Sequence, residues 1–171
     1  MSRLKQHRIA LIALLLTVAS PHWAAAQFER DPEVMTAYEA GIAALKAEEW
    51  EAAIQQFDKA IQLDDGTFAE LFFGKAEALR ELEDYQNAIT AYGEALRAND
   101  SFAQAYNGRG ICYREIDQLQ LALNDFNNAA DADRRDASIA ANLGDLLANE
   151  FQNPVEAMVY LDRAIELNPE D

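Results

Sequence analysis

Apolar residues recur at intervals of three and four positions, the spacing of a helix face, through most of this chain. In the segment AIQQFDKAIQLD, residues 53–64, Ala53, Phe57 and Ala60 recur at intervals of four and three positions. This spacing places them on one face of an α-helix. The face combines the smallest apolar side chain with one of the largest, as expected where two helices approach closely with a ring set between them.

The same small–large–small spacing occurs three more times. The further copies are Ala88, Tyr92 and Ala95; Ala122, Phe126 and Ala129; and Ala157, Leu161 and Ala164. Successive copies begin 35, 34 and 35 residues apart. A fixed period of this length indicates an array of stacked structural repeats.

A second helical segment precedes each copy, so the repeating unit is a pair of helices. Asp31-Pro32 and Asn153-Pro154 are typical helix starts, with a capping side chain before a proline in the first turn. The predicted pairs are 32–47 with a helix from residue 50, 68–82 with 85–98, 102–116 with 119–132, and 137–150 with 154–167. No strand alternation is found, so the pattern predicts an all-α fold of about eight helices.

Small residues also recur in the first helix of each pair. Gly41, Ala76, Gly110 and Gly144 lie 35, 34 and 34 residues apart. A glycine inside a helix costs about 1 kcal/mol relative to alanine, so close contact between backbones is expected at these positions. We expect these residues to face the alanines of the following helix, while the large residue fills the space toward the next repeat.

At these residues the chain resembles the tetratricopeptide repeat (TPR) family. Leu143-Gly144, the A-x3-F spacing from Ala53 to Phe57, and Asn168-Pro169 match its 34-residue unit. One departure is Lys75, which stands where the family prefers leucine. The resemblance implies a right-handed solenoid of helical hairpins behind a linker at 27–33. The four implied repeats are 34–67, 68–102, 103–136 and 137–171.

The resemblance also implies a concave groove that binds a partner protein or peptide. The implied groove residues are Met35, Tyr38, Ile42, Leu45, Phe73, Glu77, Arg80, Asn107, Ile111 and Arg114. One subgroup of the family grips the C-terminal carboxylate of chaperones, but Tyr38, Ile42 and Gly74 stand where its clamp residues belong. We therefore expect no chaperone-tail binding, and a partner that is basic or has apolar anchors.

The first 26 residues differ in character from the rest. Three basic residues, Arg3, Lys5 and Arg8, precede an apolar run at 9–19, and small residues follow at 24–26. This pattern predicts a secretory signal peptide cleaved after Ala26, and therefore a periplasmic or secreted protein. Retention of the segment as a membrane anchor is the alternative.

The remaining chain offers little for catalysis. It would carry 11 basic and 30 acidic residues, a formal net charge of −19, which disfavours nucleic acid and acidic lipid as partners. Both histidines lie within residues 1–26. The mature chain therefore cannot use histidine for catalysis or as a metal ligand. Cys112 is expected to be a small buried residue, with an intermolecular disulfide as the alternative. The acidic turns lack the spacing of a calcium loop. We expect no cofactor, no metal and no enzyme activity.

The last helix departs from its earlier copies at Met158, Val159 and Tyr160. Polar or small residues stand at the positions of Val159 and Tyr160 in the other three repeats. Random surface variation is one explanation; the other is an association face for a partner or a second copy. The sequence thus predicts a non-catalytic adaptor in an exported or cell-envelope complex, with a self-associating structural protein as the alternative.

Overall fold

The computed structural model describes residues 30–168, which form eight α-helices and no strand. The helices are α3 (Pro32–Lys46), α4 (Trp50–Leu63), α5 (Ala69–Glu81), α6 (Tyr85–Ala98), α7 (Ala103–Glu115), α8 (Leu119–Ala132), α9 (Ala137–Asn149) and α10 (Pro154–Leu167). Each lies within one residue of its expected bounds. The expected all-α helical-hairpin solenoid is confirmed. The predicted signal peptide, the first part of the linker and Pro169 lie outside the described residues.

The expected helix starts are present. The Asp31 carboxylate accepts a hydrogen bond from the Glu33 backbone N–H at 2.7 Å. The Asn153 side chain accepts one from the Glu156 N–H at 3.4 Å. In both helices the proline follows the cap directly, where its missing N–H leaves no intrahelical bond unmade.

The turn inside the fourth hairpin differs from the other three. The first three hairpins turn through a residue with φ near +60°, namely Glu48, Glu83 and Asp117. The fourth has one more residue between its helices, and its positive-φ residue is Gln152. The longer turn displaces Phe151 toward solvent, where it is 36% exposed.

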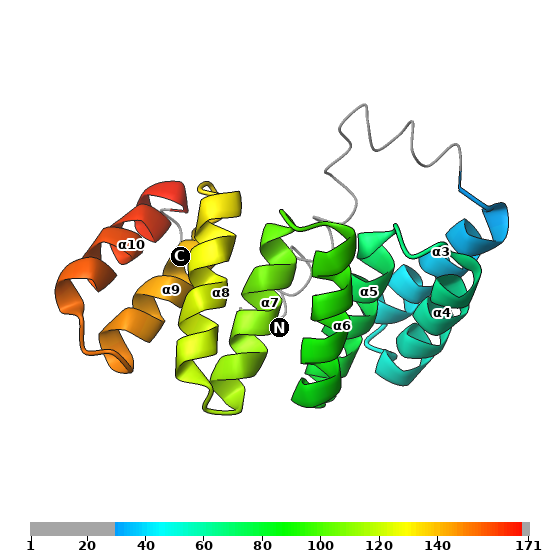
Figure 1. Cartoon of the computed structure of the whole chain (residues 1–171), viewed down its shortest axis with the longest axis horizontal. Helices are drawn as coiled ribbons and strands as arrows, with labels where there is room; N and C mark the ends of the chain where they lie inside the picture. Colours follow the sequence, from blue (N-terminus) through cyan, green and yellow to red (C-terminus); the bar gives the residue numbers. More distant parts are fainter. Residues whose placement is uncertain (1–29, 169–171) are drawn as a thin grey trace.

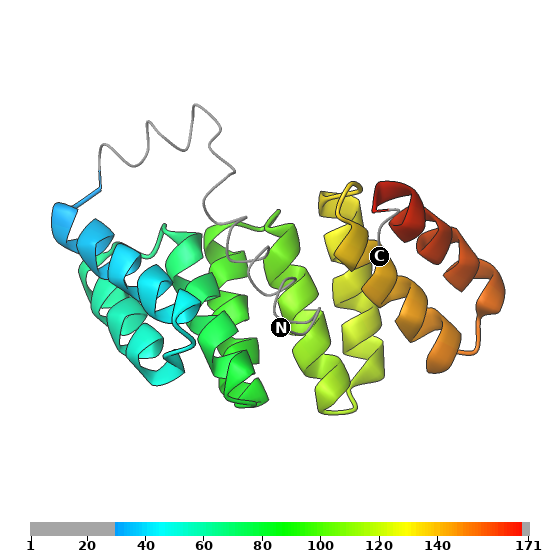
Figure 2. The ribbon, with the colours of Figure 1, turned by 180° about the vertical axis from the view of Figure 1, so that it is seen from behind.

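The helices form two layers (Figures 1 and 2). Each helix packs on its neighbours in the chain, and α3, α5, α7 and α9 also contact one another in that order. Among the described helices, α4, α6, α8 and α10 make no such mutual contacts. The row of hairpins therefore bends so that the α3–α5–α7–α9 layer is the inner one. We call it the inner layer and the other helices the outer layer.

The small residues Gly41, Gly110 and Gly144 of the inner layer lie closest to the large residue of the following helix, which stands on the same helix face as the expected alanines. A Cβ on Gly41 would lie 2.8 Å from a Phe57 ring atom, and one on Gly110 would lie 2.8 Å from Phe126. The Phe57 ring also meets the next repeat, because a Cβ on Gly74 would lie 2.4 Å from it. The long side chain stands between the two alanines and reaches the neighbouring backbone before they do. The expected placement of the large residue toward the next repeat is confirmed for Phe57, and for Tyr92, which lies against Gly108.

Candidate partner-binding surface

Two aromatic residues predicted for the groove belong to the core. The ring centroid of Tyr38 lies 4.9 Å from that of Phe68, at the start of the second repeat. Phe73 repeats this contact with Phe102, also at 4.9 Å. Tyr38 and Phe73 are only 6% and 3% exposed. Their rings therefore hold successive repeats together and offer a partner almost no surface.

The other predicted residues of α3 are also largely covered. Ile42 and Leu45 are buried in the first core cluster, and Met35 is half-buried against it. The predicted groove residues of the first repeat are therefore part of the packing between α3 and its neighbours.

Glu77 and Arg80 form a charged network on α5. The Arg80 Nη2 donates to Glu77 at 2.7 Å and lies 3.2 Å from Glu81 Oε1. The Tyr92 hydroxyl donates to Glu77, and Arg80 Nε donates to the Tyr92 oxygen at 3.3 Å. The negative charge of Glu77 raises the pKa of Arg80 well above its usual value, and burial raises the pKa of Tyr92 well above its own. The guanidinium therefore stays charged and the phenol neutral at physiological pH.

Sequence reasoning missed the role of the Tyr92 hydroxyl. The position of Tyr92, which Phe57 and Phe126 occupy in the neighbouring repeats, predicts ring packing alone. The replacement of phenylalanine by tyrosine at one of these positions was the available signal, since a buried hydroxyl normally requires a hydrogen-bond partner.

An amide pair replaces the aromatic pair between the third and fourth repeats. Asn107 stands in register with Tyr38 and Phe73. Its side-chain oxygen accepts a hydrogen bond from Asn142 Nδ2 of α9 at 2.9 Å. Each amide carries two N–H donors and a carbonyl acceptor, so their mutual bond uses only part of that capacity. The inner layer thus changes from packed rings to polar side chains along its length, and Asn142 was not among the predicted residues.

The remaining two predicted groove residues lie next to this pair on α7. Ile111 and Arg114 are half-buried, and the Arg114 Nη2 lies 3.8 Å from Glu115 Oε1. Behind them, Cys112 is fully buried, and burial raises the pKa of its thiol to about 12. Cys112 therefore packs as the expected small apolar residue and faces the core.

An ion pair between two residues that were not predicted for the groove connects α7 and α8. Arg109 donates to both carboxylate oxygens of Asp125, at 2.7 and 2.8 Å. The guanidinium carbon also lies 5.7 and 5.8 Å from the ring centroids of Tyr106 and Tyr113. These contacts fix the arginine against its own hairpin and give it a structural role.

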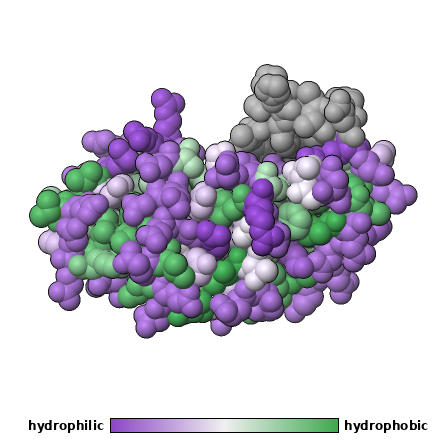
Figure 3. Space-filling model, in the orientation of Figure 1, coloured by the Kyte–Doolittle hydropathy of each residue, from purple (hydrophilic) through white to green (hydrophobic). Residues whose placement is uncertain are grey.

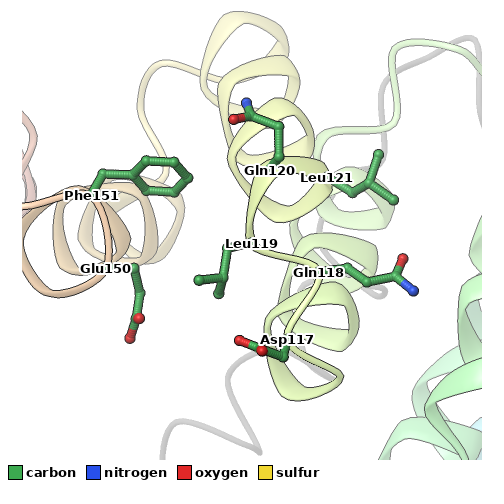
Figure 4. Close-up of a pocket in the computed structure, with 7 residues that line it drawn as sticks. All are labelled: Asp117, Gln118, Leu119, Gln120, Leu121, Glu150 and Phe151. Carbon is green, nitrogen blue, oxygen red and sulfur yellow. The ribbon is translucent and has the colours of Figure 1, made fainter.

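A shallow cavity of about 490 Å³ lies at the edge of the molecule, away from the inner layer (Figure 4). It is lined by Asp117, Gln118, Leu119, Gln120, Leu121, Glu150 and Phe151. The added residue of the longer fourth turn, Phe151, forms one wall. None of its lining residues belongs to the predicted groove.

The predicted association residues do not share one face. Met158 and Val159 are 61% and 59% exposed. Tyr160 is half-buried and packs against the third core cluster. The end of the molecule formed by α9 and α10 shows hydrophobic residues among hydrophilic ones (Figure 3).

Residues 30–168 hold neither a metal-ligand cluster nor a helix suited to a membrane. This part of the chain has no cluster of three or more metal-ligating side chains. It also has no helix whose length and hydropathy would suit a membrane span.

The comparisons with known proteins agree with this architecture. The tetratricopeptide repeat family model matches residues 73–133. The "TPR repeat-containing protein MJ1428" of Methanocaldococcus jannaschii is 27% identical over 150 residues, which is 82% of this chain. This chain spans only about a quarter of that relative (26%). Residues 73–133 are therefore assigned as tetratricopeptide repeats.

Solved structures show the same solenoid. The crystal structure of MamA superposes with a TM-score of 0.73 at 23% identity, over 82% of this chain and 81% of MamA. YrrB, described as a TPR protein with an unusual peptide-binding site, superposes with a TM-score of 0.66 at 25% identity, over 95% of this chain and 86% of YrrB. The fold is thus a TPR solenoid, a fold generally found in non-catalytic interaction modules.

Proposed function

We propose that this protein is a non-catalytic adaptor that holds a peptide or helical segment of a partner protein on its inner layer. The Asn142 amide carries the proposal, because it is half-buried and lies on the inner layer where the earlier repeats have packed rings. Asn107 is itself buried, at 8% exposed, and its side-chain oxygen orients Asn142 by accepting the 2.9 Å hydrogen bond. Amide side chains can both donate to and accept from the backbone of an extended peptide. The peptide-binding site named for YrrB supports binding at a TPR surface of this kind.

The proposed contact surface covers the second to fourth repeats. Glu77 and Arg80 form its charged part, Asn142 its amide part, and Ile111 its apolar part, with the buried Asn107 behind Asn142. The chain is strongly acidic, with a formal net charge of −16 over 171 residues. This charge favours association with a basic segment and raises the rate of encounter.

The proposed setting is a periplasmic or secreted complex, reached after cleavage behind Ala26. The basic start and apolar run of residues 1–26 support it. Intact mass spectrometry of the protein purified from the exported fraction should give a chain that begins at Gln27. A mass that includes residues 1–26 would instead favour a membrane-anchored adaptor.

The surface is tested by photo-crosslinking in an envelope extract. A benzophenone amino acid at Arg114, whose side chain is 32% exposed, should form an adduct with a partner. Asn107→Ala with Asn142→Ala should remove that adduct while the circular dichroism spectrum stays helical.

The matched control is an amide pair on the outer layer. Gln120 donates to Asn124 at 3.4 Å on the exposed side of α8. Gln120→Ala with Asn124→Ala should leave the adduct unchanged, and a crosslinker at Asn124 should give none. Equal adduct yields at Arg114 and Asn124, or none at Arg114, would contradict the proposed site.

A further inference from the structure

The outward face of α10 carries the positions by which the earlier outer helices contact the next repeat. Met158 stands in register with Ile54, Ile89 and Leu123, and Ile165 with Ile61, Leu96 and Ala130. All six counterparts are buried or half-buried, but Met158 and Ile165 are 61% and 62% exposed. Leu161 is half-buried, whereas its counterparts Phe57, Tyr92 and Phe126 are fully buried. The exposed face of α10 therefore has the composition of a repeat-to-repeat interface.

Two of the three internal interfaces, α5 on α4 and α7 on α6, are built in the same way, whereas α9 places Asn142 in register with their glycines. Gly74 of α5 accommodates the Phe57 ring of α4, and a Cβ on Gly74 would lie 2.4 Å from that ring. Buried apolar residues lie three positions before and four positions after this glycine, at Leu71 and Ala78. Helix α7 repeats the arrangement against α6, with Ala105, Gly108 and Cys112.

Charge adds a further requirement. The residue after Gly74 is Lys75, whose Nζ lies 2.6 Å from Asp58 Oδ1 on α4. Asp162 of α10 is exposed and stands in register with Asp58, whereas α6 and α8 have Gly93 and Asn127 there. The face of α10 therefore matches that of α4 in having a large apolar residue followed by an aspartate.

The first helix of a second copy does not meet these requirements. Helix α3 has Glu39 in register with Gly74 and Ala40 in register with Lys75. Head-to-tail stacking of two copies would place Glu39 opposite Leu161 and leave Asp162 without a positively charged partner. The face therefore fits a helix from a different protein better than it fits the first repeat of another copy.

We propose that the α10 face docks an α-helix of another polypeptide in the position that α5 takes on α4. The helix would present a small residue followed directly by lysine or arginine. Apolar residues would lie three positions before and four positions after the small residue. This site is separate from the inner layer, so its test does not depend on the function proposed above.

The test uses a fluorescent peptide that copies residues 68–82, which contain the Leu71, Gly74, Lys75 and Ala78 pattern. Fluorescence anisotropy should show binding to the full chain. Met158→Glu with Ile165→Glu should weaken binding about tenfold or more, as expected for the loss of two apolar contacts. Val159→Glu is the matched control, because Val159 is equally exposed but stands in register with Gln55, Thr90 and Asn124, which are exposed in their repeats.

A charge reversal distinguishes this geometry from non-specific apolar contact. A peptide carrying Lys75→Glu should bind less tightly, and Asp162→Lys in the protein should restore its binding. Failure of the reversal to restore binding would overturn the proposed register.

A tethered version removes the dependence on peptide affinity. The same segment, joined by a flexible linker after Asp171, should raise the urea midpoint above that of a matched segment carrying Gly74→Leu and Lys75→Glu. Equal midpoints would overturn the proposal. A dimer in sedimentation that is lost on Met158→Glu with Ile165→Glu would also overturn it, by assigning the face to a second copy.

Discussion

Replacing Gly74 by alanine should destabilise the solenoid, although alanine is the better helix former. The new Cβ would lie 2.4, 2.7 and 2.8 Å from three Phe57 ring atoms, well inside the roughly 3.5–4.0 Å of ordinary carbon contacts. The ring cannot move away freely, because Gly41 of α3 also packs against it, and a Cβ there would lie 2.8 Å from a ring atom. The ring is therefore held between the first and second repeats.

The expected magnitude is the difference of two effects. Overpacking in a well-packed core costs about 1–3 kcal/mol, and three close ring atoms place this site at the upper end. The gain in helix propensity from glycine to alanine is about 1 kcal/mol. We therefore expect Gly74→Ala to lower the free energy of unfolding by about 2 kcal/mol, measured by urea titration of the helical circular dichroism signal.

Gly93→Ala provides the matched control. Gly93 lies inside α6, and a Cβ there would meet only Arg109 Nη1 at 3.8 Å, an ordinary contact. This variant should gain up to about 1 kcal/mol, the propensity term alone. Gly74→Ala combined with Phe57→Leu should be less destabilised than the sum of the two single variants, because leucine occupies this position in the fourth repeat. The reasoning would be refuted if Gly74→Ala were as stabilising as Gly93→Ala.

Two further predictions concern buried polar groups. Asp125→Ala should cost about 2–3 kcal/mol, because it removes both partner oxygens of Arg109 from a site where the Asp125 side chain is 5% exposed. Asp131→Ala, which removes an exposed partner of Arg134 at 3.6 Å, should change the urea midpoint little. Cys112 should react with a thiol reagent at pH 8 about a thousandfold more slowly in the folded chain than in the unfolded one, because burial raises its pKa from 9.0 to about 12. Rapid labelling of Cys112 in the native protein would contradict the burial of the thiol. The free energy of unfolding should also fall as pH rises from about 9 toward 12, because the unfolded chain loses the thiol proton before the folded chain does.

The sequence alone determined the local structure and the architecture of this protein. The 34- and 35-residue period, the recurring Ala–large–Ala spacing and the caps at Asp31 and Asn153 were sufficient to place eight helices and to pair them. These features depend on interactions within a helix or between helices adjacent in the chain. Such interactions leave a regular mark on residue spacing.

Tertiary structure decided which side chains are available to a partner. Tyr38 and Phe73 have groove spacing, yet they contact Phe68 and Phe102 of the next repeat. Tertiary structure also placed Asn142 against Asn107, 35 positions away. An inner-layer helix contacts its own hairpin partner, the hairpin before it and the hairpin after it. Helical periodicity identifies its apolar face but cannot assign each side chain on that face to one of these neighbours or to the open surface.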